Sequence, residues 1–252
     1  MKVYYLNKEQ YQKGDTINAL RFALSLAEID KDIKTITLLV LQNQQYEWFL
    51  GEAGFTTKHF KSHVASVNGR GVQLHTVKTY HPDYVFVGHP QSELLIAVGV
   101  PPKHLEQFED FSNIKYWVIV PWLMQECEEW LSIFEAEDIE TGKKVALPEP
   151  ADERIANAID WLKATSYPNE GYHHPSDEER LHNMANAIKK YKVPFSYAST
   201  MRCAMEHGLI PSAARNTAEA FLRAQTRLFA SKYDAPDYEF LKEMMDKKHE
   251  SI

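Results

Sequence analysis

The sequence predicts a three-layer α/β domain with a largely parallel, Rossmann-like sheet, followed by an all-helical domain. Along the first 135 residues, short β-branched and aliphatic runs alternate with helical segments, as crossover connections between parallel strands require. After residue 150 the strand pattern stops and apolar residues recur at helical spacing. The residues between are acidic and contain prolines, which is typical of an exposed connector. We therefore expect an α/β sandwich domain over residues 1–135, an acidic linker over 136–150 and a helical domain over 151–252.

Five segments of the first domain are expected to form strands. The clearest pattern is Thr35–Leu41, a near-continuous apolar run typical of a strand that is buried on both faces. The helix before it ends near Ile29 and begins at Asp15 or Thr16, either of which can cap it. Ser92–Val98 is interpreted as a capped helix that Gly99 ends. The expected strands are Val3–Leu6, Thr35–Leu41, Val72–Val77, Tyr84–Val87 and Tyr116–Val120.

The last hundred residues have the periodicity of a helical module. Ser176 and Glu179 match the Ser-x-x-Glu capping box at the start of one helix. Pro211 fits the first position of another helix, where its missing N–H is not needed. The expected helices are Asp152–Lys163, Ser176–Lys190, Tyr197–His207, Pro211–Phe229 and Tyr238–Lys248.

Composition excludes several function classes. Glycine is scarce, at 10 of 252 residues, where an average usage of ~7% would give about 18. The chain has no G-x-G-x-x-G motif opening a helix, no P-loop, no G-x-S-x-G elbow and no H-E-x-x-H pair. An ordinary nicotinamide dehydrogenase, P-loop ATPase, serine hydrolase or zincin is therefore not expected, and the sequence indicates no particular cofactor.

Charge and cysteine content bear on partners and location. A net charge of −7 argues against nucleic-acid binding by the whole surface. Two cysteines cannot form a disulfide framework, and no apolar run is long enough to cross a bilayer. We expect a cytoplasmic protein of bacterial type with no membrane partner.

The predicted sheet indicates where a ligand site should lie. In open α/β sheets, ligands bind outside the carboxyl ends of the strands. Among the residues that follow the predicted strands, His89 is the candidate catalytic acid–base group, because imidazole exchanges protons near neutral pH. The other candidate contacts at this edge are Asn7, Gln42, Asn43 and the stacking surface of Trp122.

The stretch Ala53–Pro82 is unusual because it contains no acidic residue. It is interpreted as a mobile basic loop in which glycines flank Arg70 at the tip of a turn. Together with Lys58 and Lys61, Arg70 is the candidate phosphate-binding group, since guanidinium and ammonium groups bind phosphate oxygens. A solvated loop with no ligand is the competing interpretation.

Histidines and acidic residues near position 175 invite a metal interpretation. Glu178 and His182 share a helix face, and His173 or His174 could complete three ligands. Acidic residues are also favoured in the first turn of any helix, which explains the same pattern without a metal. We therefore expect no metal site.

One stretch resembles the C-terminal helical module of some uncharacterised bacterial proteins. The similar residues are Asn169-Glu170-Gly171-Tyr172-His173-His174-Pro175-Ser176-Asp177, followed by Ala204–Leu209 and Ala213-Ala214. The chain departs from that pattern at His207-Gly208-Leu209, where the module has Asn-Gly-Trp. The resemblance covers about 60 residues and implies a short helical bundle without an assigned activity.

The expected function is binding of a small phosphate-bearing, nucleotide-like ligand at the strand carboxyl ends, with turnover of that ligand left open. One alternative is a non-enzymatic module for protein–protein interaction or homo-oligomerisation. Another is a single-stranded nucleic-acid binder that uses the basic loop. A deep crevice containing His89 would favour the first, and a crevice filled by side chains would favour the second.

Overall fold

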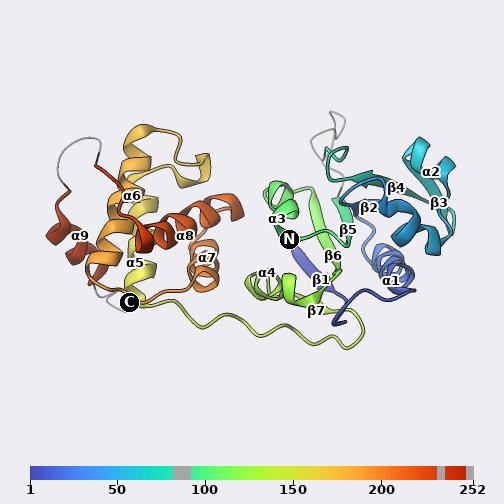
Figure 1. The fold of residues 1–252 in the computed structure, drawn as a ribbon, viewed down its shortest axis with the longest axis horizontal. Coiled ribbons are helices and arrows are strands. Elements are labelled where there is room, and N and C mark those ends of the chain that lie inside the picture. The colour runs from blue at the N-terminus through green and yellow to red at the C-terminus, as the bar shows by residue number, and fades with distance from the viewer. Residues whose placement is uncertain (82–91, 232–235, 248–252) are drawn as a thin grey trace. The chain divides into compact units, whose positions relative to one another are not determined.

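The structure is a computed structural model that describes residues 1–81, 92–231 and 236–247. The chain forms two compact units, Met1–Leu147 and Pro148–Ile252 (Figure 1). Within the described residues, no helix is both long enough and apolar enough to span a membrane.

The first unit is a three-layer α/β structure. Its described residues form a seven-stranded sheet in the order β3-β4-β2-β5-β6-β1-β7. Neighbouring strands are parallel except for the hairpin of β3 and β4. The elements are β1 (Lys2–Tyr5), α1 (Asp15–Ile29), β2 (Ile33–Val40), η1 (Tyr46–Leu50), η2 (Gly51–Ala53), α2 (Thr57–Ser62), β3 (Val64–Val67), β4 (Arg70–Thr76), β5 (Ser92–Val98), α3 (Pro102–Leu105), η3 (Glu106–Phe108), β6 (Ile114–Val120), η4 (Met124–Glu126), α4 (Glu128–Ile133) and β7 (Glu137–Asp138).

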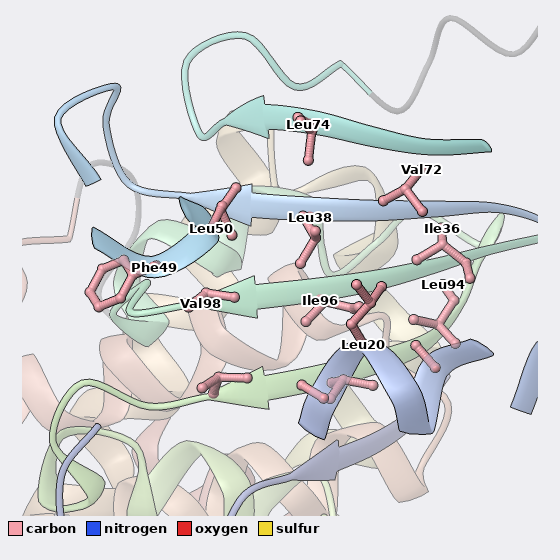
Figure 2. Packing of buried hydrophobic residues seen from close by; sticks show 14 of the residues in the cluster. Leu20, Ile36, Leu38, Phe49, Leu50, Val72, Leu74, Leu94, Ile96 and Val98 are labelled. Carbon is pink, nitrogen blue, oxygen red and sulfur yellow. The ribbon is translucent and has the colours of Figure 1, made fainter. Parts of the chain in front are cut away.

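The sheet is covered on both faces, which confirms the expected three-layer architecture. On one face, side chains of β2, β4 and β5 pack against Leu20 of α1 and against Phe49 and Leu50 of η1 (Figure 2). On the other face, residues of β2, β5, β6 and β1 pack against Leu105 and Trp130, from α3 and α4. Because both faces are buried there, β2, β5 and β6 are largely apolar instead of alternating.

The prediction of a helix at Ser92–Val98 is wrong, since this segment is the central strand β5. It pairs with β2 on one side and β6 on the other. Seven residues that begin with a serine and are followed by a glycine satisfy the start and stop signals of a short helix as well as those of a buried strand. This segment forms a strand because it pairs with β2 and β6, which lie on either side of it. The strand expected at Tyr84–Val87 lies outside the described residues.

The interpretation of Ala53–Pro82 as a mobile basic loop is also wrong for its described part. This stretch forms α2 and the hairpin β3–β4, in which Val67 pairs with Arg70. Asn68 and Gly69 both have positive φ, of 52° and 77°, and form the two-residue turn. Asn-Gly is a strong signal for a two-residue hairpin turn, so Arg70 is a strand residue and not the tip of a loop.

The segment expected to be an exposed linker is partly built into the sheet. β7 pairs in parallel with β1, and Ala136 and Asp138 are buried. Asp138 holds the turn that follows, because its carboxylate accepts hydrogen bonds from the backbone N–H of Glu140 and the hydroxyl of Thr141. The acidic composition of this segment therefore reflects a local turn as well as solvent exposure.

The second unit is helical, and its described residues contain no strand. Pro211 begins its helix as expected, but the predicted capping box at Ser176 is wrong. Pro175 begins that helix one residue earlier, and His174 accepts a hydrogen bond from the Ser176 N–H as the N-cap. The elements are α5 (Glu153–Thr165), η5 (Pro168–Glu170), α6 (Pro175–Lys190), α7 (Tyr197–Glu206), α8 (Pro211–Thr226) and α9 (Tyr238–Met245).

Candidate functional site

The sheet reverses its winding between β2 and β5. The connection after β2 leads to β4 on one side, whereas the connection after β5 leads to β6 on the other. Such a point is where open α/β sheets form a ligand crevice at the carboxyl ends of their strands. The side chains around the ends of β2 and β5 therefore decide whether a crevice exists.

In the described part of the chain, an aromatic cluster of Tyr11, Phe49 and Trp122 fills this central crevice. The ring of Phe49 lies at the carboxyl end of the strands, beyond Val98 (Figure 2). It lies so close to Gly99 that a Cβ on this glycine would be 2.7 Å from the ring. Tyr11 contacts Phe49 edge to face with centroids 4.7 Å apart, and stacks on Trp122 at 6.1 Å.

A hydrogen-bond network holds the aromatic cluster in place. The Tyr11 hydroxyl donates to Glu52 Oε1, and Glu52 Oε2 accepts from the Gly14 N–H at 2.9 Å. Burial, together with the hydrogen bond to Glu52, raises the pKa of Tyr11 above its ordinary value, so the phenol remains a donor. The filled crevice favours a site elsewhere on this edge of the sheet.

A pocket of about 680 Å³ lies beside the cluster, at the carboxyl ends of β2 and β4. Its volume is in the range of small-molecule sites, ~300–1,000 Å³. Three segments line it: the turn and η1 after β2, helix α2 with the residue that follows it, and the turn after β4. The lining residues are Asn43, Gln44, Tyr46, Glu47, Thr57, Phe60, Lys61, His63 and Thr79.

Two stacked aromatic rings form the apolar wall of this pocket. Tyr46 and Phe60 lie nearly parallel, with an interplanar angle of 7° and centroids 4.4 Å apart. The Tyr46 side chain is buried, and its hydroxyl has no hydrogen-bond partner among the described residues. Burial raises the pKa of Tyr46, so the hydroxyl stays protonated.

The two charged residues of the lining come from α2 and η1. Lys61 is exposed, and in the described part of the chain its ammonium group has no ion-pair partner. The acidic residue of the lining, Glu47, is exposed as well. The pocket therefore offers one cation, one carboxylate, amides and hydroxyls around the aromatic wall.

His63 is the most constrained residue of the lining. It has a φ of 56°, a left-handed conformation that few residues other than glycine adopt. Its ring Nδ1 lies 2.9 Å from the carbonyl oxygen of Leu74, and its own carbonyl accepts from the Leu74 N–H. The imidazole also stacks on His75 at 5.4 Å, and burial together with the nearby charge of His63 lowers the pKa of His75.

The structure brings two of the predicted contacts, Asn43 and Lys61, into one pocket. Asn7 lines a different hollow, beside Glu128 and Glu129 of α4. Gln42 is exposed in the turn after β2, and Lys58 is exposed on α2 without lining the pocket. Trp122 belongs to the aromatic cluster, and His89 lies outside the described residues.

Arg70 lies at the opposite edge of the sheet. As the first residue of β4 it is at the amino end, and its guanidinium donates to the carbonyl oxygens of Ala27 and Ile33 at 3.2 and 3.3 Å. Arg70 thereby links the last turn of α1 to the first residue of β2 through hydrogen bonds. The expected convergence of Arg70 with Lys61 on one phosphate does not occur, because the hairpin places them at opposite ends of β4.

His63, Tyr46 and Thr79 also line the pocket, and the sequence did not predict them as contacts. One signal in the sequence could have identified His63. The Asn-Gly pair five residues later predicts a hairpin turn, and in such a hairpin the residue before the first strand lies beside the carboxyl end of the second strand. Tyr46 and Thr79 follow predicted strands by a few residues, beyond the positions that we considered.

In the helical unit, His173, Glu178 and His182 line a separate hollow of about 410 Å³, together with Glu219 and Arg223. Across the described residues, no group of three His, Cys, Asp or Glu side chains is arranged to hold a metal ion. His182 stacks on Phe229, with ring centroids 3.8 Å apart. These histidines therefore take part in packing and in the hollow's wall.

The fold and its pocket define a class: a three-layer α/β unit with a ligand-sized pocket beside a filled central crevice, joined to a helical unit. No family model matches the chain, and neither the curated proteins nor the solved structures provide a match.

Proposed function

We propose that the α/β unit binds a small phosphate-bearing ligand in the pocket at the carboxyl ends of β2 and β4. The observation that carries the proposal is the composition of this pocket, which combines Lys61 with amide and hydroxyl groups and a stacked aromatic wall. An ammonium group without an ion-pair partner among the described residues is available to neutralise an anionic ligand.

The other lining groups suit the rest of such a ligand. Asn43, Gln44 and Thr57 can each donate a hydrogen bond to phosphate oxygens. The aromatic wall of Tyr46 and Phe60 provides apolar contact area for a ring or a carbon chain. This arrangement gives Lys61 the role of the charge contact and Asn43 that of a polar contact.

Two lysines on the same short helix provide the experiment. Lys61→Gln removes the charge from the pocket, whereas Lys58→Gln removes the same charge three residues away, outside the lining. We expect Lys61→Gln to weaken binding of a phosphorylated ligand by about tenfold or more, because a charge-assisted bond contributes ~1.5–3 kcal/mol. Lys58→Gln should bind as the unmodified protein does.

The measurement is a thermal-shift screen of nucleoside monophosphates and sugar phosphates, followed by calorimetric titration of those that raise the melting temperature. Equal binding by the two glutamine variants would contradict the proposal. If no phosphorylated compound shifts the melting temperature, the interaction-module alternative, which the filled central crevice favours, should replace it.

A further inference from the structure

The imidazole of His63 is held in one orientation by three contacts. Its Nδ1 lies 2.9 Å from the Leu74 carbonyl oxygen, its backbone is bonded to the same leucine, and its ring stacks on His75 with an interplanar angle of 9°. The positive φ of His63 adds backbone strain, which persists only where the surroundings over-determine the conformation. The side chain is therefore preorganised before any ligand binds.

The hydrogen bond to Leu74 assigns the tautomer of this imidazole. A carbonyl oxygen can only accept, so Nδ1 must carry the proton. In the neutral ring the other nitrogen, Nε2, then presents a lone pair and can only accept a hydrogen bond. Within the described residues, Nε2 has no hydrogen-bond partner, and His63 lines the pocket.

We infer that the pocket selects a hydroxylated phosphate ester, whose phosphate binds Lys61 and whose hydroxyl donates to Nε2 of His63. The inference rests on the proposed function and specifies its ligand class. The carboxylate of Glu47 in the same lining is a second acceptor for hydroxyl groups. The pocket thus pairs one cation with two acceptors, which suits a sugar-phosphate type of ligand better than a phosphate ester that lacks hydroxyls.

The matched probes are glycerol 3-phosphate and propyl phosphate, which have the same chain length and phosphate and differ by two hydroxyls. A site built to accept a hydroxyl discriminates against an analogue without it, since the acceptor is then left without a partner. By calorimetric titration, we expect the unmodified protein to bind glycerol 3-phosphate at least about tenfold more tightly than propyl phosphate.

His63→Asn is the diagnostic variant. Asparagine tolerates positive φ, and its side-chain amide can keep the bond to the Leu74 carbonyl while Nε2 is lost. This variant should lose most of the preference for glycerol 3-phosphate and keep only the part that Glu47 contributes, while its affinity for propyl phosphate stays unchanged. Lys61→Gln should weaken both probes by a similar factor.

The outcomes distinguish failure of the proposed function from failure of the inference about the hydroxyl. If the unmodified protein binds neither probe, both the proposed function and this inference fail. If it binds both equally and Lys61→Gln weakens both, the proposed function stands and the inference is overturned. Nitrogen-15 spectra of the histidine rings give an independent check, since a proton on Nε2 of neutral His63 would also overturn it.

Discussion

Glu93 is a carboxyl group buried on one face of the sheet. It lies in the central strand β5, is 7% exposed, and accepts a hydrogen bond from the hydroxyl of Thr37 in the neighbouring strand. Burial raises the pKa of Glu93 above its ordinary value of 4.5, and the bond from Thr37 offsets only part of this effect. The folded protein therefore holds this proton to a higher pH than the unfolded chain does.

The raised pKa of Glu93 makes the protein less stable at higher pH. Between pH 4.5 and the higher pKa of the folded state, the native protein binds more protons than the unfolded chain, so stability falls as pH rises. Glu93→Gln cannot ionise and keeps an oxygen that accepts from Thr37. We expect this variant to be more stable than the unmodified protein at pH 8 by about 1 kcal/mol or more.

Urea unfolding of both proteins from pH 4 to pH 8 measures this difference. The stability difference should be smallest at pH 4, should widen between pH 4.5 and the pKa of Glu93 in the folded protein, and should then level off. A gap that stays constant across this range would show that Glu93 has the same pKa in the folded and unfolded states.

At the scale of elements, the end of β5 and helix η1 are fitted to each other. Gly99 ends β5 with a φ of 60°, and Phe49 of η1 occupies the space that a side chain at this position would need. The N–H of Gly99 also donates to the carbonyl oxygen of Val120, which aligns the ends of β5 and β6. A side chain here should displace Phe49 and loosen the aromatic cluster.

Gly99→Ala tests this fit, with Gly54→Ala as the control. Both glycines have positive φ, but a Cβ on Gly54 meets no atom within 4 Å. We expect Gly54→Ala to lower the free energy of unfolding by ~1–2 kcal/mol, which is the cost of a left-handed conformation for alanine. Gly99→Ala should lower it by a further ~1–3 kcal/mol because the added methyl group overpacks the site. Urea unfolding measures the free energy of unfolding of both variants. Equal decreases would show that Phe49 makes room for the methyl group without a loss of stability.

At the scale of the whole molecule, each unit contains one buried cysteine. Cys127 is the N-cap residue that precedes α4 in the α/β unit, and Cys203 lies in α7 of the helical unit. Burial raises the pKa of Cys127 to about 12 and that of Cys203 to about 11. Because the thiolate is the reactive species, both should react slowly while their units are folded.

We expect the two cysteines to report the unfolding of their units separately. Each unit has its own buried core, so pulse labelling with iodoacetamide along a urea series should give two transitions with different midpoints. Mass spectrometry of the peptides identifies which cysteine is labelled, and Cys127→Ala and Cys203→Ala confirm the assignment. A single shared midpoint would show that the two units unfold as one.

Much of the α/β fold was predictable because its strands have strong local patterns. Thr35–Leu41 and Tyr116–Val120 are apolar runs too short for most helices, and each matches a strand to within two residues. Ser92–Val98 has the same apolar character but was assigned to a helix from its flanking residues. The local signals there are compatible with both structures, and only pairing with β2 and β6 distinguishes them.

The candidate site was less predictable because its residues come from the ends of several helices and strands, and only the folded structure determines which of these ends lie side by side. Asn43 lies two residues after the predicted strand Thr35–Leu41, and its place at the carboxyl edge could be inferred from the sequence. Lys61 and Arg70 belong to one basic stretch, yet the hairpin sends Lys61 to the pocket and Arg70 to the carbonyl groups near α1. Their separation is a property of strand pairing, which composition does not encode.

By itself, the sequence determined the layered α/β unit and the helical unit, and it predicted the carboxyl edge of the sheet as the place to look for a ligand. Those features follow from local periodicity, which each segment carries alone. Only the tertiary structure decided that Phe49 fills the central crevice and that His63 turns one ring nitrogen to Leu74. These features depend on contacts between segments far apart in the chain, and the free energy of such contacts is set by packing and hydrogen bonding in the assembled core.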